Sequence, residues 1–183
     1  DLKRAYLDEL GVHVVESYGQ SELGGFVAMG YPKTEPPQRF FAIGPGLPDR
    51  ETRVVDEKGQ EQPLGQPGEL VIRGGVMLGY WNMPEKTEAV LQDDWLHTGD
   101  MGVMDSEGYF TLLGRWSERI VVNGQVIYPR TMEEALLRHA AVHYAGVIGK
   151  ATGSGSQVPL AVVELNPDHA TSAEELLEHC RAI

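Results

Sequence analysis

The sequence is poor in cysteine, in basic residues and in long apolar stretches. Its single cysteine, Cys180, excludes an internal disulfide, and its acidic surroundings lack the cationic groups that activate a thiolate. The chain has 15 lysines and arginines against 27 aspartates and glutamates. Its net charge of −12 argues against general electrostatic binding to nucleic acid. No apolar run approaches the roughly 20 residues of a membrane span. We therefore expect a soluble, cytoplasmic protein with no membrane span.

The first part of the chain has the pattern of the end of an α/β subdomain, over residues 1–23. Apolar side chains at helical spacing predict a helix over 2–10, with Gly11 as its stop. The β-branched run 12–16 predicts a short buried strand that leads residues 17–22 into a loop. Open α/β sheets bind ligands at such strand ends, so this loop is a candidate site.

From residue 24 to residue 114 the helical period disappears, and short alternating runs are separated by glycine and proline. This texture predicts a small antiparallel β-barrel-like or sandwich subdomain. Lys58-Gly59 indicates a hairpin turn, and Pro84 indicates the start of a short helix over 84–91. The strand-like runs are 52–56, 68–73, 76–80 and 109–113.

Residues 115–183 have the pattern of a small α+β domain that looks incomplete. Asn123-Gly124 between two β-branched runs is a strong hairpin signal. Thr171 and the glutamate three residues later form the pattern of a helix capping box. The other predicted elements are a helix over 131–139, strands over 142–149 and 160–165, and a helix over 171–179.

Three clusters carry polar groups that an apolar core would not select. In the first, Tyr18, Ser21 and Glu22 could stack a base, touch a phosphate and hold a hard cation, although an ordinary polar turn has the same composition. In the second, Asp100 follows a glycine and could accept hydrogen bonds from vicinal hydroxyls, although many such aspartates only form turns. In the third, Arg115 could bind phosphate or ribose, or be a surface arginine of a linker.

With its clusters in this order, the sequence resembles the adenylate-forming superfamily of acyl-CoA synthetases, peptide-synthetase adenylation domains and luciferases. Residues 18–22 resemble its Tyr-Gly-x-Thr-Glu motif, with serine for threonine, and 68–81 resemble its Gly-Glu-Leu segment. Residues 95–100 resemble the Trp-x-x-Thr-Gly-Asp motif, and Gly114-Arg115 opens the hinge motif. The resemblance implies that 1–114 is the C-terminal part of a large adenylation domain and that 115–183 is the hinge with an incomplete C-terminal domain.

The resemblance also implies roles for individual residues and substrates. Members join a small-molecule carboxylic acid to ATP as an acyl-adenylate, release pyrophosphate, and pass the acyl group to coenzyme A. Ser21 and Glu22 would be catalytic, with Ser21 at phosphate and Glu22 at Mg²⁺. The cofactor-binding residues would be Tyr18 near the adenine with Gly19 beside it, Asp100 and Arg115 at the ribose, and Gly124 near a pantetheine arm.

The hinge implied by the resemblance falls at Ser117, where family members more often carry aspartate or lysine. The Asn-Gly turn explains Gly124 without any ligand, so both readings of that glycine stay open.

Two family parts are absent from the printed sequence. The phosphate loop would precede Asp1, and the lysine used in adenylation would follow Ile183, so we expect a fragment that is inactive alone. Two alternatives remain: transfer of the acyl group to a carrier protein or other acceptor, and a non-catalytic degenerate homologue.

Overall fold

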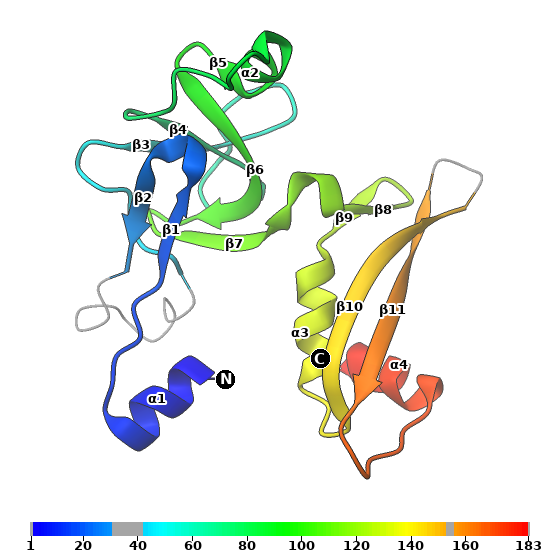
Figure 1. Cartoon of the computed structure of the whole chain (residues 1–183). Coiled ribbons are helices and arrows are strands. Elements are labelled where there is room, and N and C mark those ends of the chain that lie inside the picture. The colour runs from blue at the N-terminus through cyan, green and yellow to red at the C-terminus, as the bar shows by residue number, and fades with distance from the viewer. Residues whose placement is uncertain (1, 31–41, 153–155, 183) are drawn as a thin grey trace. The chain divides into compact units, whose positions relative to one another are not determined.

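The computed structural model describes residues 2–30, 42–152 and 156–182. It divides into two compact units, Asp1–Leu112 and Leu113–Ile183, and each unit has its own hydrophobic core. Both units are mixtures of helices and small antiparallel sheets, so the predicted α/β and α+β fold class is confirmed (Figure 1).

The first unit begins with helix α1, Leu2–Leu10, which ends where the sequence predicted. Gly11 has φ +64°, and its N–H donates to the Leu7 carbonyl at 3.0 Å, which closes the helix. The prediction of a buried strand over 12–16 is wrong, since this run has no regular structure and its three valines are exposed. β-Branched side chains favour a strand only where a partner strand and a packing surface are present.

The first candidate cluster lies on a short hairpin rather than in a loop. Strand β1, Ser17–Gln20, pairs antiparallel with β2, Gly25–Met29. A single 3₁₀ turn, η1 (Ser21–Leu23), connects them and ends at Gly24, which has φ +66°.

A five-stranded antiparallel sheet forms most of the first unit (Figure 1). Its strands are β3 (Glu51–Val55), β4 (Gly68–Arg73), β5 (Leu91–Gln92), β6 (Trp95–Met104) and β7 (Phe110–Arg115). The order is β3-β4-β6-β5, with β7 also paired to β6. Among the described residues this ladder is open, so the expected barrel-like closure is corrected to an open sheet.

Other details of this unit both confirm and correct the sequence predictions. Helix α2, Pro84–Val90, begins at the predicted proline. The turn at Lys58-Gly59 is present, and the Gly59 N–H donates to the Asp56 carbonyl at 3.0 Å. The expected strand over 76–80 is wrong, because this segment forms an irregular loop.

The core of the first unit lies between the β1–β2 hairpin and the sheet. The hairpin contributes Tyr18 and Val27, and the sheet contributes Ile72 and Leu96, which face each other in the β4–β6 ladder. This packing places the first and second candidate clusters in the same unit although about 80 residues separate them.

The second unit contains η3 (Trp116–Glu118), β8 (Ile120–Val122), β9 (Gln125–Ile127), α3 (Pro129–Leu137), β10 (Val142–Ala151), β11 (Gln157–Leu165) and α4 (Ala173–Ala182). Asn123 and Gly124 have φ +51° and +82°, as the predicted two-residue hairpin turn requires. Helix α3 packs on β10, and α4 packs on α3.

The helix cap of α4 begins one residue later than predicted. The Ser172 hydroxyl oxygen accepts the Glu175 N–H at 3.1 Å, so Ser172 is the N-cap. Thr171 instead donates its hydroxyl to the Glu175 carboxylate at 2.8 Å. No helix in the described parts of the chain is long and apolar enough to cross a membrane.

Candidate functional site

Asp100 is the centre of the candidate site in the first unit. It lies on β6 with only 6% of its surface exposed. Its Oδ2 atom accepts the Tyr18 hydroxyl at 2.5 Å and the Gln20 side-chain amide at 2.8 Å. Tyr18 and Gln20 are two residues apart on β1 and share one face of that strand. The structure therefore brings Tyr18 and Asp100 together.

A β-bulge in β6 sets the position of Asp100. Glu69 pairs with Met101 and Val71 pairs with His97, so one residue of β4 faces three residues of β6, 98–100. Gly99 has φ +72°, a conformation that glycine adopts without steric cost. Asp100 thus lies in a strand with a bulge, and the turn-forming alternative is wrong. Bulges redirect side chains, and many lie beside active sites.

Thr98 stabilises this bulge from inside the sheet. Its hydroxyl donates to the Leu70 carbonyl at 2.6 Å and accepts the Asp100 N–H at 3.1 Å. The side chain is buried, and these two hydrogen bonds span the place where the strand register changes. The backbone of Asp100 is therefore tied to β4.

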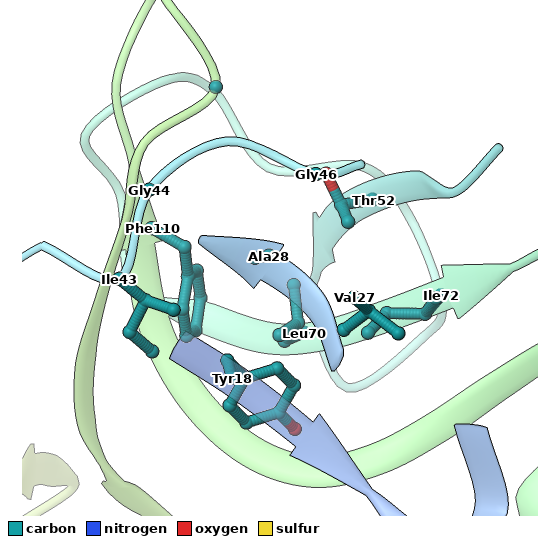
Figure 2. Close-up of a pocket in the computed structure, with 11 residues that line it drawn as sticks. Tyr18, Val27, Ala28, Ile43, Gly44, Gly46, Thr52, Leu70, Ile72 and Phe110 are labelled. Atoms are coloured by element: carbon teal, nitrogen blue, oxygen red, sulfur yellow. The ribbon is translucent and has the colours of Figure 1, made fainter. Parts of the chain in front are cut away.

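The Tyr18 ring is part of the hydrophobic core. Figure 2 shows it beside Ile43, Phe110 and Leu70, with its hydroxyl directed away from these apolar side chains. Tyr18 is 8% exposed, and the remaining cavity beside its ring is only about 10 Å³. Tyr18 therefore anchors the hairpin through its ring and holds Asp100 through its hydroxyl.

Gly19 has a structural reason to be glycine. A Cβ atom at this position would lie 2.2 Å from the Gly25 carbonyl oxygen of the paired strand. The close approach of β1 and β2 requires that side chain to be absent. Its assignment to cofactor binding stays a prediction.

Ser21 and Glu22 lie on η1, next to the loop that follows β4. Ser21 is exposed and Glu22 is half-buried. The Tyr80 hydroxyl donates to Glu22 Oε1 at 2.7 Å, and the Met77 N–H donates to the Glu22 carbonyl at 2.7 Å. These contacts attach the loop to the 3₁₀ turn and orient the Glu22 carboxylate.

The Tyr80–Glu22 hydrogen bond predicts a pH dependence of stability. It raises the pKa of Tyr80 above 10.0, with burial and the Glu22 charge adding to the effect. The raised folded-state pKa means that this stabilisation is complete below pH 10.0 and declines as the pH rises through the raised value. Tyr80→Phe should lower the free energy of unfolding by about 1 kcal/mol at neutral pH. Urea unfolding at several pH values would measure this difference.

The matched control for Tyr80→Phe is Tyr144→Phe, which removes an exposed hydroxyl of the second unit. We expect its unfolding free energy to stay close to that of the original protein. A Tyr80→Phe difference that stays constant as the pH rises well above 10.0 would contradict the assignment of this hydrogen bond.

The remaining predicted residues lie in the second unit or at its start. Arg115 is exposed at the end of β7, and Ser117 lies in η3. Gly124 lies in the β8–β9 turn, and no atom lies within 4 Å of a Cβ added there. Its positive φ explains the glycine by the turn alone, and the roles of all three residues stay predictions.

A cleft of about 700 Å³ in the second unit includes Ser117 in its lining. Its two arginines already have contacts within the protein. Arg119 stacks on the Trp116 ring at 4.0 Å, and Arg130 Nε lies 2.9 Å from Glu134 Oε1. The lining also carries Glu118 and Glu133, so the described part of the cleft has charges of both signs rather than one net sign.

The structure also shows which atoms could hold a metal. In the part of the chain that it describes, no three His, Cys, Asp or Glu side chains come together as a metal site. Mg²⁺, however, is commonly held by one or two carboxylates together with substrate phosphates. The single carboxylate of Glu22 fits that manner of binding.

Sequence reasoning missed Gln20, Thr98 and Tyr80. Assigning residues 17–20 to a strand would have put Gln20 on the same face as Tyr18. Thr98 and Tyr80 lie within motifs that the sequence shares with the family, but no local pattern shows their partners, Leu70 and Glu22.

Models of protein families match both units. The model described as "AMP-binding enzyme" matches residues 1–81, and that described as "AMP-binding enzyme C-terminal domain" matches residues 131–183. The chain belongs to this family of AMP-binding, adenylate-forming enzymes.

Curated relatives include CoA ligases of bacteria and mammals. A long-chain-fatty-acid–CoA ligase of Escherichia coli O6:H1 is 35% identical over 173 residues, which is 93% of this chain and 30% of that protein. A mitochondrial medium-chain acyl-CoA ligase of Mus musculus is 35% identical over 185 residues, 99% of this chain and 30% of that protein. The chain thus spans less than a third of these relatives.

Solved structures agree with this family. MatB from Rhodopseudomonas palustris with bound ATP has a TM-score of 0.89 at 31% identity, covering 98% of this chain and 36% of that chain. O-succinylbenzoate coenzyme A synthetase from Bacillus subtilis with AMP has a TM-score of 0.86 at 33% identity, covering 96% of this chain and 36% of that chain. The amide bond synthetase McbA from Marinactinospora thermotolerans has a TM-score of 0.87 at 30% identity, covering 97% of this chain and 36% of that chain.

Proposed function

We propose that the full-length protein is an ATP-dependent carboxylate–CoA ligase. The substrate carboxylate attacks the α-phosphate of ATP, and pyrophosphate leaves as the acyl-adenylate forms. The coenzyme A thiolate then attacks the acyl carbonyl, and AMP leaves as the thioester forms. Relatives named as CoA ligases over 93% and 99% of this chain support this reaction.

The observation that carries the proposal is the buried carboxylate of Asp100 on its bulge. An ionised carboxylate only accepts hydrogen bonds, and vicinal ribose hydroxyls donate them. Tyr18 and Gln20 both donate to Oδ2, which orients the carboxylate group. We assign Asp100 to the ribose of the nucleotide, with Arg115 as a second ribose ligand. Tyr18 and Gly19 are assigned to the adenine side through the backbone of β1, because the Tyr18 ring packs in the core and is not placed to stack on a base.

Ser21 and Glu22 are assigned to the phosphates. The Ser21 hydroxyl is exposed on η1 and can donate to a phosphate oxygen. Because Tyr80 engages Glu22 Oε1, we assign Oε2 to Mg²⁺. When bound, Mg²⁺ neutralises negative charge on the phosphates.

We assign the second unit to the conformational change between the adenylation step and the thioester-forming step. Ser117 is the proposed hinge, and the open backbone at Gly124 is the proposed approach for the pantetheine arm of coenzyme A. The cationic Arg115 lies two residues before this hinge.

The test is pyrophosphate release by the full-length protein from ATP over a panel of carboxylic acids, with and without coenzyme A. We expect acid-dependent release that rises with coenzyme A, together with an acyl-CoA product identified by mass spectrometry. The acid that gives the highest rate identifies the substrate class. Nucleotide binding without any release over a broad panel would instead support a non-catalytic homologue.

A second candidate function is transfer of the activated acyl group to another acceptor, such as an amine or a carrier protein. The similarity to the amide bond synthetase favours it. The two functions differ in product: an acyl-adenylate that accumulates in the presence of coenzyme A and is consumed by an amine or a carrier protein would support the second.

A further inference from the structure

We propose that Glu69 is a positioning residue that fixes the direction of Asp100 by clamping the bulge in β6. Glu69 does not contact the nucleotide in this proposal and acts through the backbone of Gly99. The inference rests on the proposed function, in which Asp100 binds the ribose.

The Glu69 carboxylate makes two contacts to β6, one with each of its oxygens. Oε1 accepts the Gly99 N–H at 2.9 Å, and Oε2 lies 2.8 Å from His97 Nδ1. Its side chain is only 15% exposed and that of His97 is 21% exposed, so both contacts are largely shielded from water. One carboxylate therefore joins the two residues that flank Thr98.

The bulge explains why this carboxylate is needed. Extra residues in a bulge do not match the register of the neighbouring strand, so the regular ladder does not supply all their hydrogen bonds. A shielded N–H group without an acceptor is costly. Glu69 gives the Gly99 N–H an acceptor at the point where the register shifts between Glu69 and Val71.

The same contact limits the freedom of the residue next to Asp100. Gly99 has φ +72°, and glycine has access to many other backbone conformations. A rotation at Gly99 would turn the Asp100 carboxylate away from Tyr18 and Gln20. Fixing the Gly99 N–H therefore fixes the direction of the Asp100 side chain.

A merely structural role for Glu69 makes a different prediction. A role limited to holding β4 and β6 together through His97 and Gly99 would contribute to stability and would affect the binding of all ligands alike. A positioning role through Asp100 affects only ligands that carry ribose hydroxyls. Comparing AMP with 2′,3′-dideoxyadenosine monophosphate, which lacks both hydroxyls, separates the two roles.

The experiment is titration calorimetry of both nucleotides with the full-length protein and its variants. Glu69→Ala should weaken AMP binding about tenfold and binding of the dideoxy nucleotide less than about twofold. In an Asp100→Ala background, adding Glu69→Ala should cause little further loss of AMP binding, because coupled residues are not additive. Glu69→Gln keeps an acceptor oxygen for the Gly99 N–H and should give an intermediate loss.

The matched control is Glu61→Ala, which removes the same charge at an exposed site between β3 and β4. It should leave binding of both nucleotides unchanged. Hydrogen exchange gives a readout that needs no nucleotide: the Gly99 amide should exchange faster in Glu69→Ala and should be unchanged in Glu61→Ala.

Two results would overturn the positioning role. One is that Glu69→Ala weakens binding of AMP and of the dideoxy nucleotide by the same factor. The other is that Glu69→Ala weakens AMP binding in the Asp100→Ala background as much as it does in the original protein. If Glu69→Ala does not fold, Glu69→Gln carries the same comparison, and its AMP loss must exceed its dideoxy loss. A different result is that the original protein binds no AMP while Glu69→Ala still speeds hydrogen exchange of the Gly99 amide. That result would overturn the proposed function, and Glu69 would then hold the bulge for stability alone.

Discussion

Replacing Asp100 with alanine should weaken binding of ATP and AMP to the full-length protein by at least about 100-fold. The variant loses the charged acceptor for the ribose hydroxyls. It also leaves the buried Tyr18 hydroxyl without the acceptor it has at 2.5 Å, which should lower the free energy of unfolding by about 1–3 kcal/mol. Calorimetric titration and urea unfolding measure the two effects separately.

Asp100→Asn distinguishes loss of binding from loss of folding. Asparagine keeps an oxygen that can accept from Tyr18 and Gln20, so its stability should exceed that of Asp100→Ala while its nucleotide affinity stays low. Glu88→Ala, which removes an exposed carboxylate on α2, is the charge control and should bind normally. Unchanged AMP affinity in a folded Asp100→Ala protein would refute the ribose assignment.

Replacing Ile72 with alanine should produce the largest loss of stability, about 2–5 kcal/mol. Ile72 is 0% exposed near the end of β4, where it pairs with Leu96 across the ladder and belongs to the core under the hairpin. Removing its side-chain atoms leaves a cavity between the sheet and β1–β2. Denaturant unfolding gives the magnitude, and hydrogen exchange resolved by segment should place the loss in the first unit.

Leu78→Ala is the control for this core substitution, because Leu78 is fully exposed in the loop after β4. Its effect on the free energy of unfolding should lie within about 0.5 kcal/mol. An Ile72→Ala protein as stable as this control would mean that the hairpin does not pack on the sheet as described.

The fold was predictable where the cause is local. Gly11 ends α1, Pro84 begins α2, and Asn123-Gly124 forms the hairpin turn as predicted. Each of these signals acts through the φ angles of one or two residues. The run 12–16 misled because its β-branched residues favour a strand only when a partner is present.

The sequence predicted which residues belong to the candidate site better than it predicted how they contact one another. Motif order identified Tyr18 and Asp100 as members of one site, and the structure shows their hydrogen bond. The motifs do not reveal that the Gln20 amide donates to the same carboxylate oxygen of Asp100, or that the Tyr80 hydroxyl donates to the Glu22 carboxylate. These contacts join residues 58 and 80 positions apart, for which no local pattern exists.

By itself, the sequence determined the family, the mixed α and β character of the chain and the positions of its turns, because motif residues and backbone conformations are local properties. The tertiary structure alone decided how Asp100 is presented. Its direction depends on the register of β6 against β4, on the bulge at Gly99 and on the hairpin that carries Tyr18. Strand register is set by the partner strand and the shared core, and neither is written in the residues next to Asp100.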